Sequence, residues 1–208
     1  MIVPAAYSRF DRNADRRGAA GLRLCLRSVT AAAHNRLDAR FRSLDLTGVA
    51  GYRQFLEANA AALLPLEAAL VHARVGRIVP DWAARSRQAA ILDDLARTGG
   101  KMEPLPLPDP LDFGGVLGTM YVLESSRLGA TALLNLVQRS NEPTVLCATA
   151  YLRHGAGHDF WQSFLTALES HPATLHESGA IDGAVRAFEM FEQAAARALR
   201  PAAQTASA

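Results

Sequence analysis

Four polar residues recur at one-turn spacing along an amphipathic segment near the start of the chain. At helical spacing, Arg27, Thr30, His34 and Asp38 share one stripe. An Asp one turn after a His can orient the imidazole, as it does for many metal-ligating histidines. A basic residue two turns earlier suits an anionic group on the same ligand. The stripe therefore indicates either a metal-binding His34 or a surface His–Asp pair with an incidental Arg27.

A second stretch, residues 114–134, is apolar enough to form a core helix but contains several glycines and serines. Each Gly inside a helix costs about 1 kcal/mol relative to Ala, so a close backbone approach or a bend is expected there. One face of this helix carries Gly118, Val122, Ser125, Gly129 and Ala132. That face predicts either close packing against another helix or bare backbone lying against a thin ligand.

The remaining candidates are weaker. His154 and His158 stand four residues apart, but the glycines between them disfavour a helix that would bring both onto one metal. Cys25 and Cys147 lie among apolar residues and are expected to be buried thiols without a disulfide. The sequence contains no paired carboxylates, Ser-His-Asp order, phosphate-binding loop or CxxC motif.

Composition predicts a single all-α domain. The chain has 208 residues, half of them hydrophobic, and the helix formers Ala and Leu dominate. The net charge of +2 indicates no nucleic-acid partner, although residues 1–42 hold nine arginines and three aspartates. The absence of a long apolar run predicts no membrane span, and the absence of a signal-like start predicts a cytoplasmic protein.

The apolar periodicity predicts a helical domain over residues 21–200, between a flexible arm at 1–20 and a disordered tail at 201–208. Thr47 is expected to cap the second helix, and Pro65 to kink or break it. The central helix is expected to bend near residues 125–129. The predicted helices cover about 22–41, 49–71, 81–97, 113–139, 145–152, 160–168 and 179–199.

Two motifs resemble one protein family. Residues Arg27–Asp38, RSVTAAAHNRLD, resemble the first-helix motif of haem oxygenases. Residues Tyr121–Leu133, YVLESSRLGATAL, resemble the distal-helix motif of the bacterial biliverdin-forming group, which is often associated with bacteriophytochromes and reads approximately YVLEGSxLGG. Three further segments, Tyr52–Leu70, Arg87–Gly99 and Trp161–Leu168, resemble other helices of that group in the same order. The resemblance covers roughly residues 22–199.

This resemblance implies a haem oxygenase-like all-α bundle in which haem lies between the first helix and a bent distal helix. It makes His34 the axial iron ligand and Arg27 a partner of a haem propionate. The other implied haem-binding residues are Thr30, Asp38, Gly118, Tyr121 and Ala130, and the implied catalytic residues are Ser125, Ser126 and Gly129.

The implied reaction cleaves haem to biliverdin, CO and ferrous iron with O2. A ferredoxin or a reductase would supply the electrons, and a bacteriophytochrome is a candidate acceptor of the biliverdin.

Two positions depart from the family pattern. Ser125 stands where the first distal Gly is usual, and Ala130 stands where the last one is usual. A side chain at 125 could crowd the haem, so a haem carrier or sensor without turnover is the main alternative. Two others are a thiaminase-like enzyme of similar architecture, which would need a reactive Cys in a polar pocket, and a helical interaction module without a ligand.

Overall fold

The computed structural model describes residues 19–171 and 173–199, and every regular element in these ranges is helical. The predicted all-α class is therefore confirmed. The elements are α2 (Ala19–Arg42), α3 (Val49–His72), the 3-10 turn η2 (Val75–Arg77), α4 (Trp82–Arg85), α5 (Gln88–Thr98), α6 (Phe113–Val137), α7 (Pro143–Cys147), α8 (Ala150–Arg153), α9 (Phe160–Glu169) and α10 (Ala173–Ala198).

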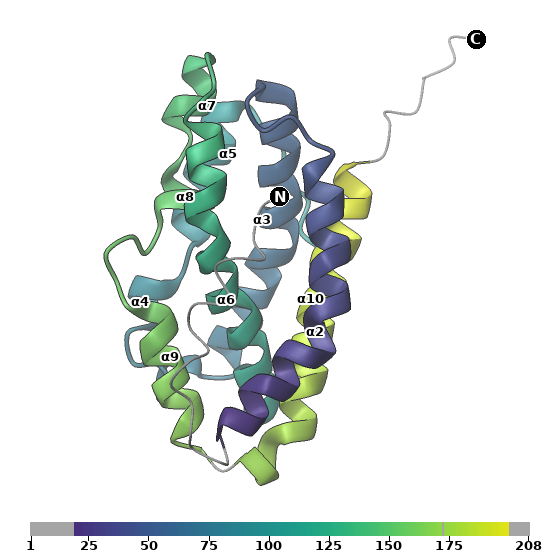
Figure 1. Cartoon of the computed structure of the whole chain (residues 1–208), viewed down its shortest axis with the longest axis vertical. Helices are drawn as coiled ribbons and strands as arrows, with labels where there is room; N and C mark the ends of the chain where they lie inside the picture. The colour runs from purple at the N-terminus through teal and green to yellow at the C-terminus, as the bar shows by residue number, and fades with distance from the viewer. Residues whose placement is uncertain (1–18, 172, 200–208) are drawn as a thin grey trace, which may run out of the picture.

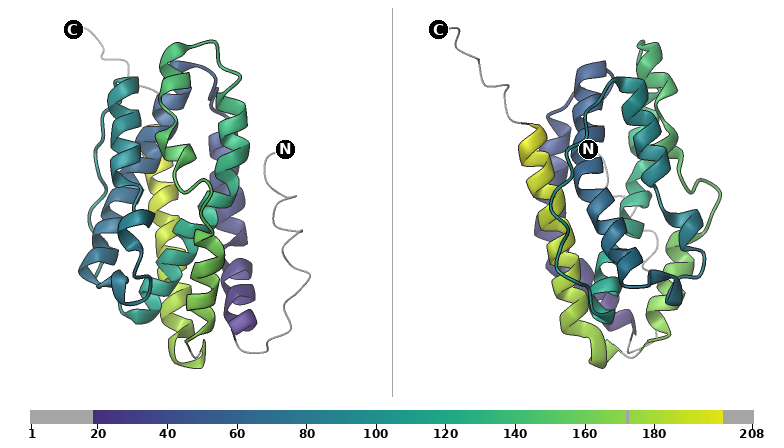
Figure 2. Two further views of the ribbon diagram at one scale, coloured as in Figure 1. Left: turned by 90° about the vertical axis from the view of Figure 1, so that its left-hand side faces the viewer. Right: turned by 180° about the vertical axis from the view of Figure 1, so that it is seen from behind.

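Four long helices, α2, α3, α6 and α10, run roughly along the long axis of the molecule (Figure 1). Helix α10 packs against the other three, whereas the main contacts of α2 are with α10 rather than with α6. The shorter helices α5, α8 and α9 cover α3 and α6 on the opposite side (Figure 2). Helices α2 and α6 consequently make few direct contacts with each other.

The first half of α6 lies backbone to backbone against α10. A Cβ atom added at Gly118 would come within 1.9 Å of the Ala180 carbonyl oxygen, and one at Gly183 within 2.5 Å of the Gly115 carbonyl oxygen. Both contacts are shorter than any real Cβ contact, so these positions require glycine. The placement of Gly118 on a ligand-binding face was therefore wrong, because its backbone packs against α10.

Pro65 neither breaks α3 nor leaves a buried carbonyl unpaired. Proline has no N–H, so the carbonyl oxygen of Ala61, four residues earlier, loses its partner within the helix. The backbone N–H of Leu105, in the proline-rich segment between α5 and α6, donates to that oxygen at 2.9 Å. The helix consequently continues from Val49 to His72, and the connector is fixed along it.

Other predicted boundaries shifted because side chains bond to backbone across the fold. The expected helix at 81–97 is split into α4 and α5, since Glu67 accepts hydrogen bonds from the Ser86 hydroxyl and the Arg87 N–H. The expected helix at 145–152 is likewise split into α7 and α8. Gly48, rather than Thr47, is the N-cap of α3, and Thr47 donates to Asp45 instead.

The terminal predictions lie largely outside the described residues, which exclude 1–18 and 200–208; Ala19 and Ala20 belong to α2. Among the helices that are described, none has the length and apolar character needed to cross a membrane.

The contact between α6 and α10 predicts a specific stability effect. Gly118→Ala should lower the free energy of unfolding by about 3 kcal/mol or more, because a methyl group forced between two backbones has no room to relax. Gly21→Ala, at an open position in α2, should be neutral or stabilising by up to about 1 kcal/mol. Chemical denaturation measures both values, and equal values would contradict the packing described.

Candidate functional site

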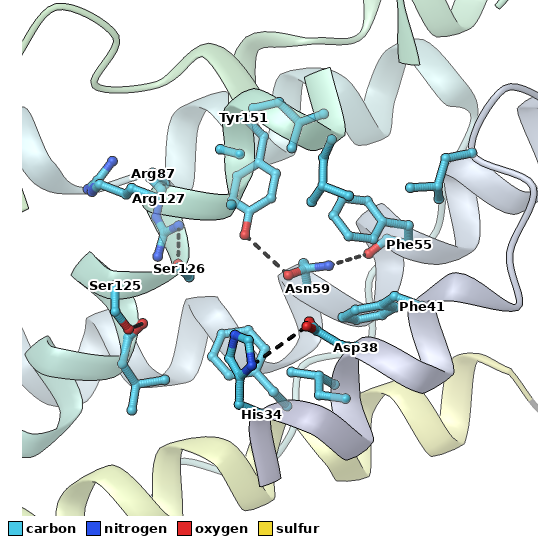
Figure 3. A pocket seen from close by; sticks show the side chains of 18 of the residues that line it. His34, Asp38, Phe41, Phe55, Asn59, Arg87, Ser125, Ser126, Arg127 and Tyr151 are labelled. Atoms are coloured by element: carbon cyan, nitrogen blue, oxygen red, sulfur yellow. Dashed lines mark hydrogen bonds and ion pairs between the residues drawn. The ribbon is translucent and has the colours of Figure 1, made fainter. Parts of the chain in front are cut away.

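A cavity of about 420 Å³ lies between the C-terminal half of α2 and the second half of α6. This volume falls within the range of about 300–1,000 Å³ that is typical of small-molecule sites. Figure 3 shows its polar side chains on opposite walls, with His34 and Asp38 on α2 facing Ser125 and Ser126 on α6. The remaining lining is mostly apolar and includes Leu37, Phe41, Leu46, Phe55, Val122, Leu133, Leu136 and Phe191.

The α2 wall brings together two of the four predicted stripe residues. The Nδ1 atom of His34 lies 3.6 Å from Oδ2 of Asp38, and the imidazole meets the Phe188 ring edge-on at 6.1 Å between ring centres. Partial burial raises the pKa of Asp38, although His34 and Arg42 both oppose that rise. His34 is one-third exposed, so its ring is both held in place and accessible.

The other two stripe residues do not line the cavity. Thr30 is buried, and its hydroxyl donates to the Leu26 carbonyl oxygen at 2.7 Å within α2. Arg27 lies nearly two turns before His34 and is not among the residues that line the cavity.

The α6 wall contains four predicted residues, Ser125, Ser126, Gly129 and Ala130. The Ser125 hydroxyl donates to the Val122 carbonyl oxygen at 3.1 Å. The Ser126 hydroxyl donates to the Leu123 carbonyl oxygen at 2.7 Å. Both serine side chains therefore fold back onto α6. At Gly129 and Ala130 the wall carries almost no side chain, so the backbone of α6 lies close to the cavity.

Tyr121 lies away from this wall. It is buried, and its ring packs against Trp161 of α9 with 5.7 Å between ring centres. Tyr121 is not among the residues that line the cavity, so the expectation that it contacts the ligand is corrected: its ring packs against α9 instead.

A polar wall that the sequence did not reveal closes the cavity on a third side. Arg87 enters from the break between α4 and α5, and its guanidinium donates to the Ser126 hydroxyl at 3.0 Å and to the Leu123 carbonyl oxygen at 3.2 Å. Its Nε atom is buried without a hydrogen-bond partner among the described residues. The Tyr151 hydroxyl donates to the Asn59 side chain at 3.2 Å, and burial raises the pKa of Tyr151, so the phenol stays neutral.

A buried ion cluster supports the polar wall from behind. Glu124 lies 3.0 Å from Arg127 Nε and 3.4 Å from Arg85 Nη1, and the side chains of Glu124 and Arg85 are each 1% exposed. Arg127 Nη1 donates to His154 Nδ1 at 3.0 Å. Burial and the two nearby arginines lower the pKa of His154 to about 4, so this imidazole is neutral at ordinary pH.

One residue of this cluster, Glu124, could have been recognised from the sequence. Glu124 is a carboxylate inside an otherwise apolar helix, and such a residue needs a buried cationic partner. Arg127, three residues later on the same helix, follows from the spacing. The sequence does not identify Arg85, because it reaches Glu124 only through the tertiary fold.

The remaining candidates from the sequence, two cysteines and two histidines, do not come together as metal ligands. Cys147 is exposed and Cys25 is partly buried, so the prediction of two buried thiols was wrong. His158 stacks on Phe160 instead of joining His154. Over residues 19–171 and 173–199, no group of three or more His, Cys, Asp or Glu side chains could hold a metal ion.

Comparison with known proteins supports the fold. No protein-family model matches the chain, and no curated protein sequence matches it significantly. A solved structure that does match is the NO- and CO-bound haem oxygenase from Neisseria meningitidis, with a TM-score of 0.74 and 21% sequence identity over 88% of this chain and 94% of that one. The chain has a haem oxygenase-like fold. At this identity the likeness shows the fold alone.

The buried cluster predicts a large effect from a small substitution. Glu124→Gln keeps the shape of the side chain but leaves Arg85 and Arg127 without their shared carboxylate. Breaking a buried pair in this way costs about 3–5 kcal/mol. Asp93→Asn, which removes an exposed ion pair to Arg97, should change stability by less than about 1 kcal/mol. Urea unfolding of both variants checks the difference, and a loss below about 1 kcal/mol in Glu124→Gln would contradict the account.

Proposed function

We propose that this protein is a haem oxygenase that binds haem between α2 and α6 and cleaves it to biliverdin, CO and ferrous iron. The observation that carries the proposal is the cavity itself, in which an accessible His34 on α2 faces the small residues of α6. The haem oxygenase-like fold of the chain also supports it.

The residues around the cavity fit haem in three respects. His34 can ligate iron through Nε2, because Nδ1 is turned toward Asp38. The aromatic and aliphatic lining suits the apolar faces of a porphyrin. Three arginines line the cavity, Arg42, Arg87 and Arg127, and together they suit a ligand that carries two carboxylates.

Each wall then has a distinct role in the proposed reaction. Bound haem would supply the iron that reacts with O2 and an external reductant. Asp38 orients His34, while Gly129 and Ala130 let the α6 backbone lie close to the ligand. Ser125 and Ser126 define how much room remains on that side, and Arg87 fixes the Ser126 hydroxyl in position. The apolar lining keeps bulk water away.

The electron donor, the acceptor of the product and the cellular location are part of the same proposal. The electron donor would be a ferredoxin or a reductase, and a bacteriophytochrome is one acceptor for the biliverdin. A cytoplasmic location remains a prediction from the sequence.

A hemin titration followed by reduction tests the proposal. Binding should produce a Soret band of a histidine-ligated haem, and addition of ascorbate or a ferredoxin system should replace that band with biliverdin absorption. Binding without loss of the Soret band would favour the second candidate, a haem carrier or sensor. Ser125 supports that candidate, because its buried side chain occupies space in the wall where the family usually has glycine.

The role of His34 predicts a defined spectral change. His34→Ala should lose the histidine-ligated spectrum and all turnover, and added imidazole should restore part of the spectrum by entering the vacated position. His158→Ala, which removes an exposed histidine outside the cavity, serves as the control and should leave the spectrum unchanged. Absorption spectroscopy of the hemin complexes checks both variants, and an unchanged spectrum in His34→Ala would remove His34 as the ligand.

The role of Ser125 predicts a gain of efficiency. Ser125→Gly should raise the yield of biliverdin per O2 consumed, because removing the side chain would let the α6 backbone lie closer to the ligand. The variant should also lose about 0.5–1 kcal/mol of stability, as Gly does inside a helix. Ser28→Gly, at an exposed position in α2, controls for that loss. An equal or lower yield with hemin still bound would show that the serine assists the reaction.

A further inference from the structure

The three arginines around the cavity differ in how their guanidinium groups are engaged. Arg87 is buried and bonds to Ser126 and Leu123. Arg127 is held by Glu124 and His154. Arg42 is 49% exposed, and its contact with Asp38 is an ion pair at 3.9 Å, which is longer than a hydrogen bond. Arg42 can therefore turn toward an anionic ligand without breaking a buried network.

The position of Arg42 on α2 suits a carboxylate at the edge of a ligand centred on His34. Arg42 lies eight residues after His34 on the same helical stripe, which corresponds to about 12 Å of helix rise. Side chains on a helix lean toward its N-terminus, so a long Arg side chain reaches back toward His34. Arg27 precedes His34 on the same helix, so the same rule predicts that its side chain leans away from His34, and Arg27 is not among the lining residues.

We infer that Arg42, rather than Arg27, pairs with the carboxylates of the bound porphyrin and thereby sets its in-plane orientation. The inference rests on the proposed function and names the residue that orients the substrate. Asp38 does not block this contact, because a guanidinium group presents five N–H donors and can serve two carboxylates at once. The orientation in turn decides which edge of the porphyrin meets Gly129 and Ala130.

The test compares hemin with hemin dimethyl ester, which has the same porphyrin and iron but no free carboxylates. The measured quantity is the ratio of their two affinities for the full-length protein, read from the Soret band. Arg42→Gln should reduce the preference for hemin over the ester by about twofold to fivefold, which is the range for a partly exposed charge pair. Arg42→Lys keeps the charge and should retain most of the preference.

Two further variants make the test specific. Arg40→Gln removes an exposed Arg of the same helix that does not line the cavity, and it should leave the ratio unchanged. Arg27→Gln should also leave the ratio unchanged. The ratio of biliverdin isomers provides a second readout, which Arg42→Gln should shift and the other two variants should not.

An unchanged affinity ratio in Arg42→Gln, or a reduced ratio in Arg27→Gln instead, would overturn the inference while leaving the proposed function in place. Failure of the wild-type protein to bind either porphyrin would overturn the proposed function, and the inference with it. Helix content measured by circular dichroism confirms that each variant is folded before the affinities are compared.

Discussion

The backbone contact between α6 and α10 is the constraint on which the cavity depends. Glycines in both helices bring the two backbones together along the first half of α6. Helix α2 then packs mainly on α10, and the second half of α6 faces α2 across the cavity. A bulkier residue in this contact would push α6 outward and change the distance between the two walls, although it lies outside the cavity itself.

This constraint explains why the glycine-rich stretch of the sequence was only partly interpreted correctly. Its face was expected to serve either helix packing or a ligand. In the structure the first half packs against α10, and the second half lines the cavity. Gly118 belongs to the packing half, whereas Ser125, Gly129 and Ala130 belong to the cavity half. Periodicity places residues on one face of a helix, but it cannot say where along the helix the neighbour changes.

Local sequence patterns predicted most of the long helices, because their apolar stripes face a single core. They failed where long-range hydrogen bonds decide the outcome. Glu67 separates α4 from α5 through the backbone of Arg87, and Asp94 accepts the N–H groups of Ala150 and Tyr151 at the start of α8. Both carboxylates act on segments distant in the chain, so their effect cannot be read from neighbouring residues.

The candidate site also has one part that local sequence predicts and another part that forms only through long-range contacts. His34 and Asp38 could be predicted because they lie on one helix, four residues apart. The polar wall could not be predicted, because Asn59, Arg87 and Tyr151 come from three separate parts of the chain and meet only in the folded protein. The buried cluster around Glu124 then holds the middle of α6 to α4 and to His154, and so fixes the wall that carries the serines.

The central claim is that a single ligand joins α2 to α6 across the cavity. Hydrogen–deuterium exchange of the full-length protein, with and without hemin, tests this claim directly. Bound hemin should slow exchange in both facing segments, residues 34–42 of α2 and 125–136 of α6, because the ligand completes the contact between them. Protection confined to one of these helices, or located mainly elsewhere in the bundle, would contradict the account.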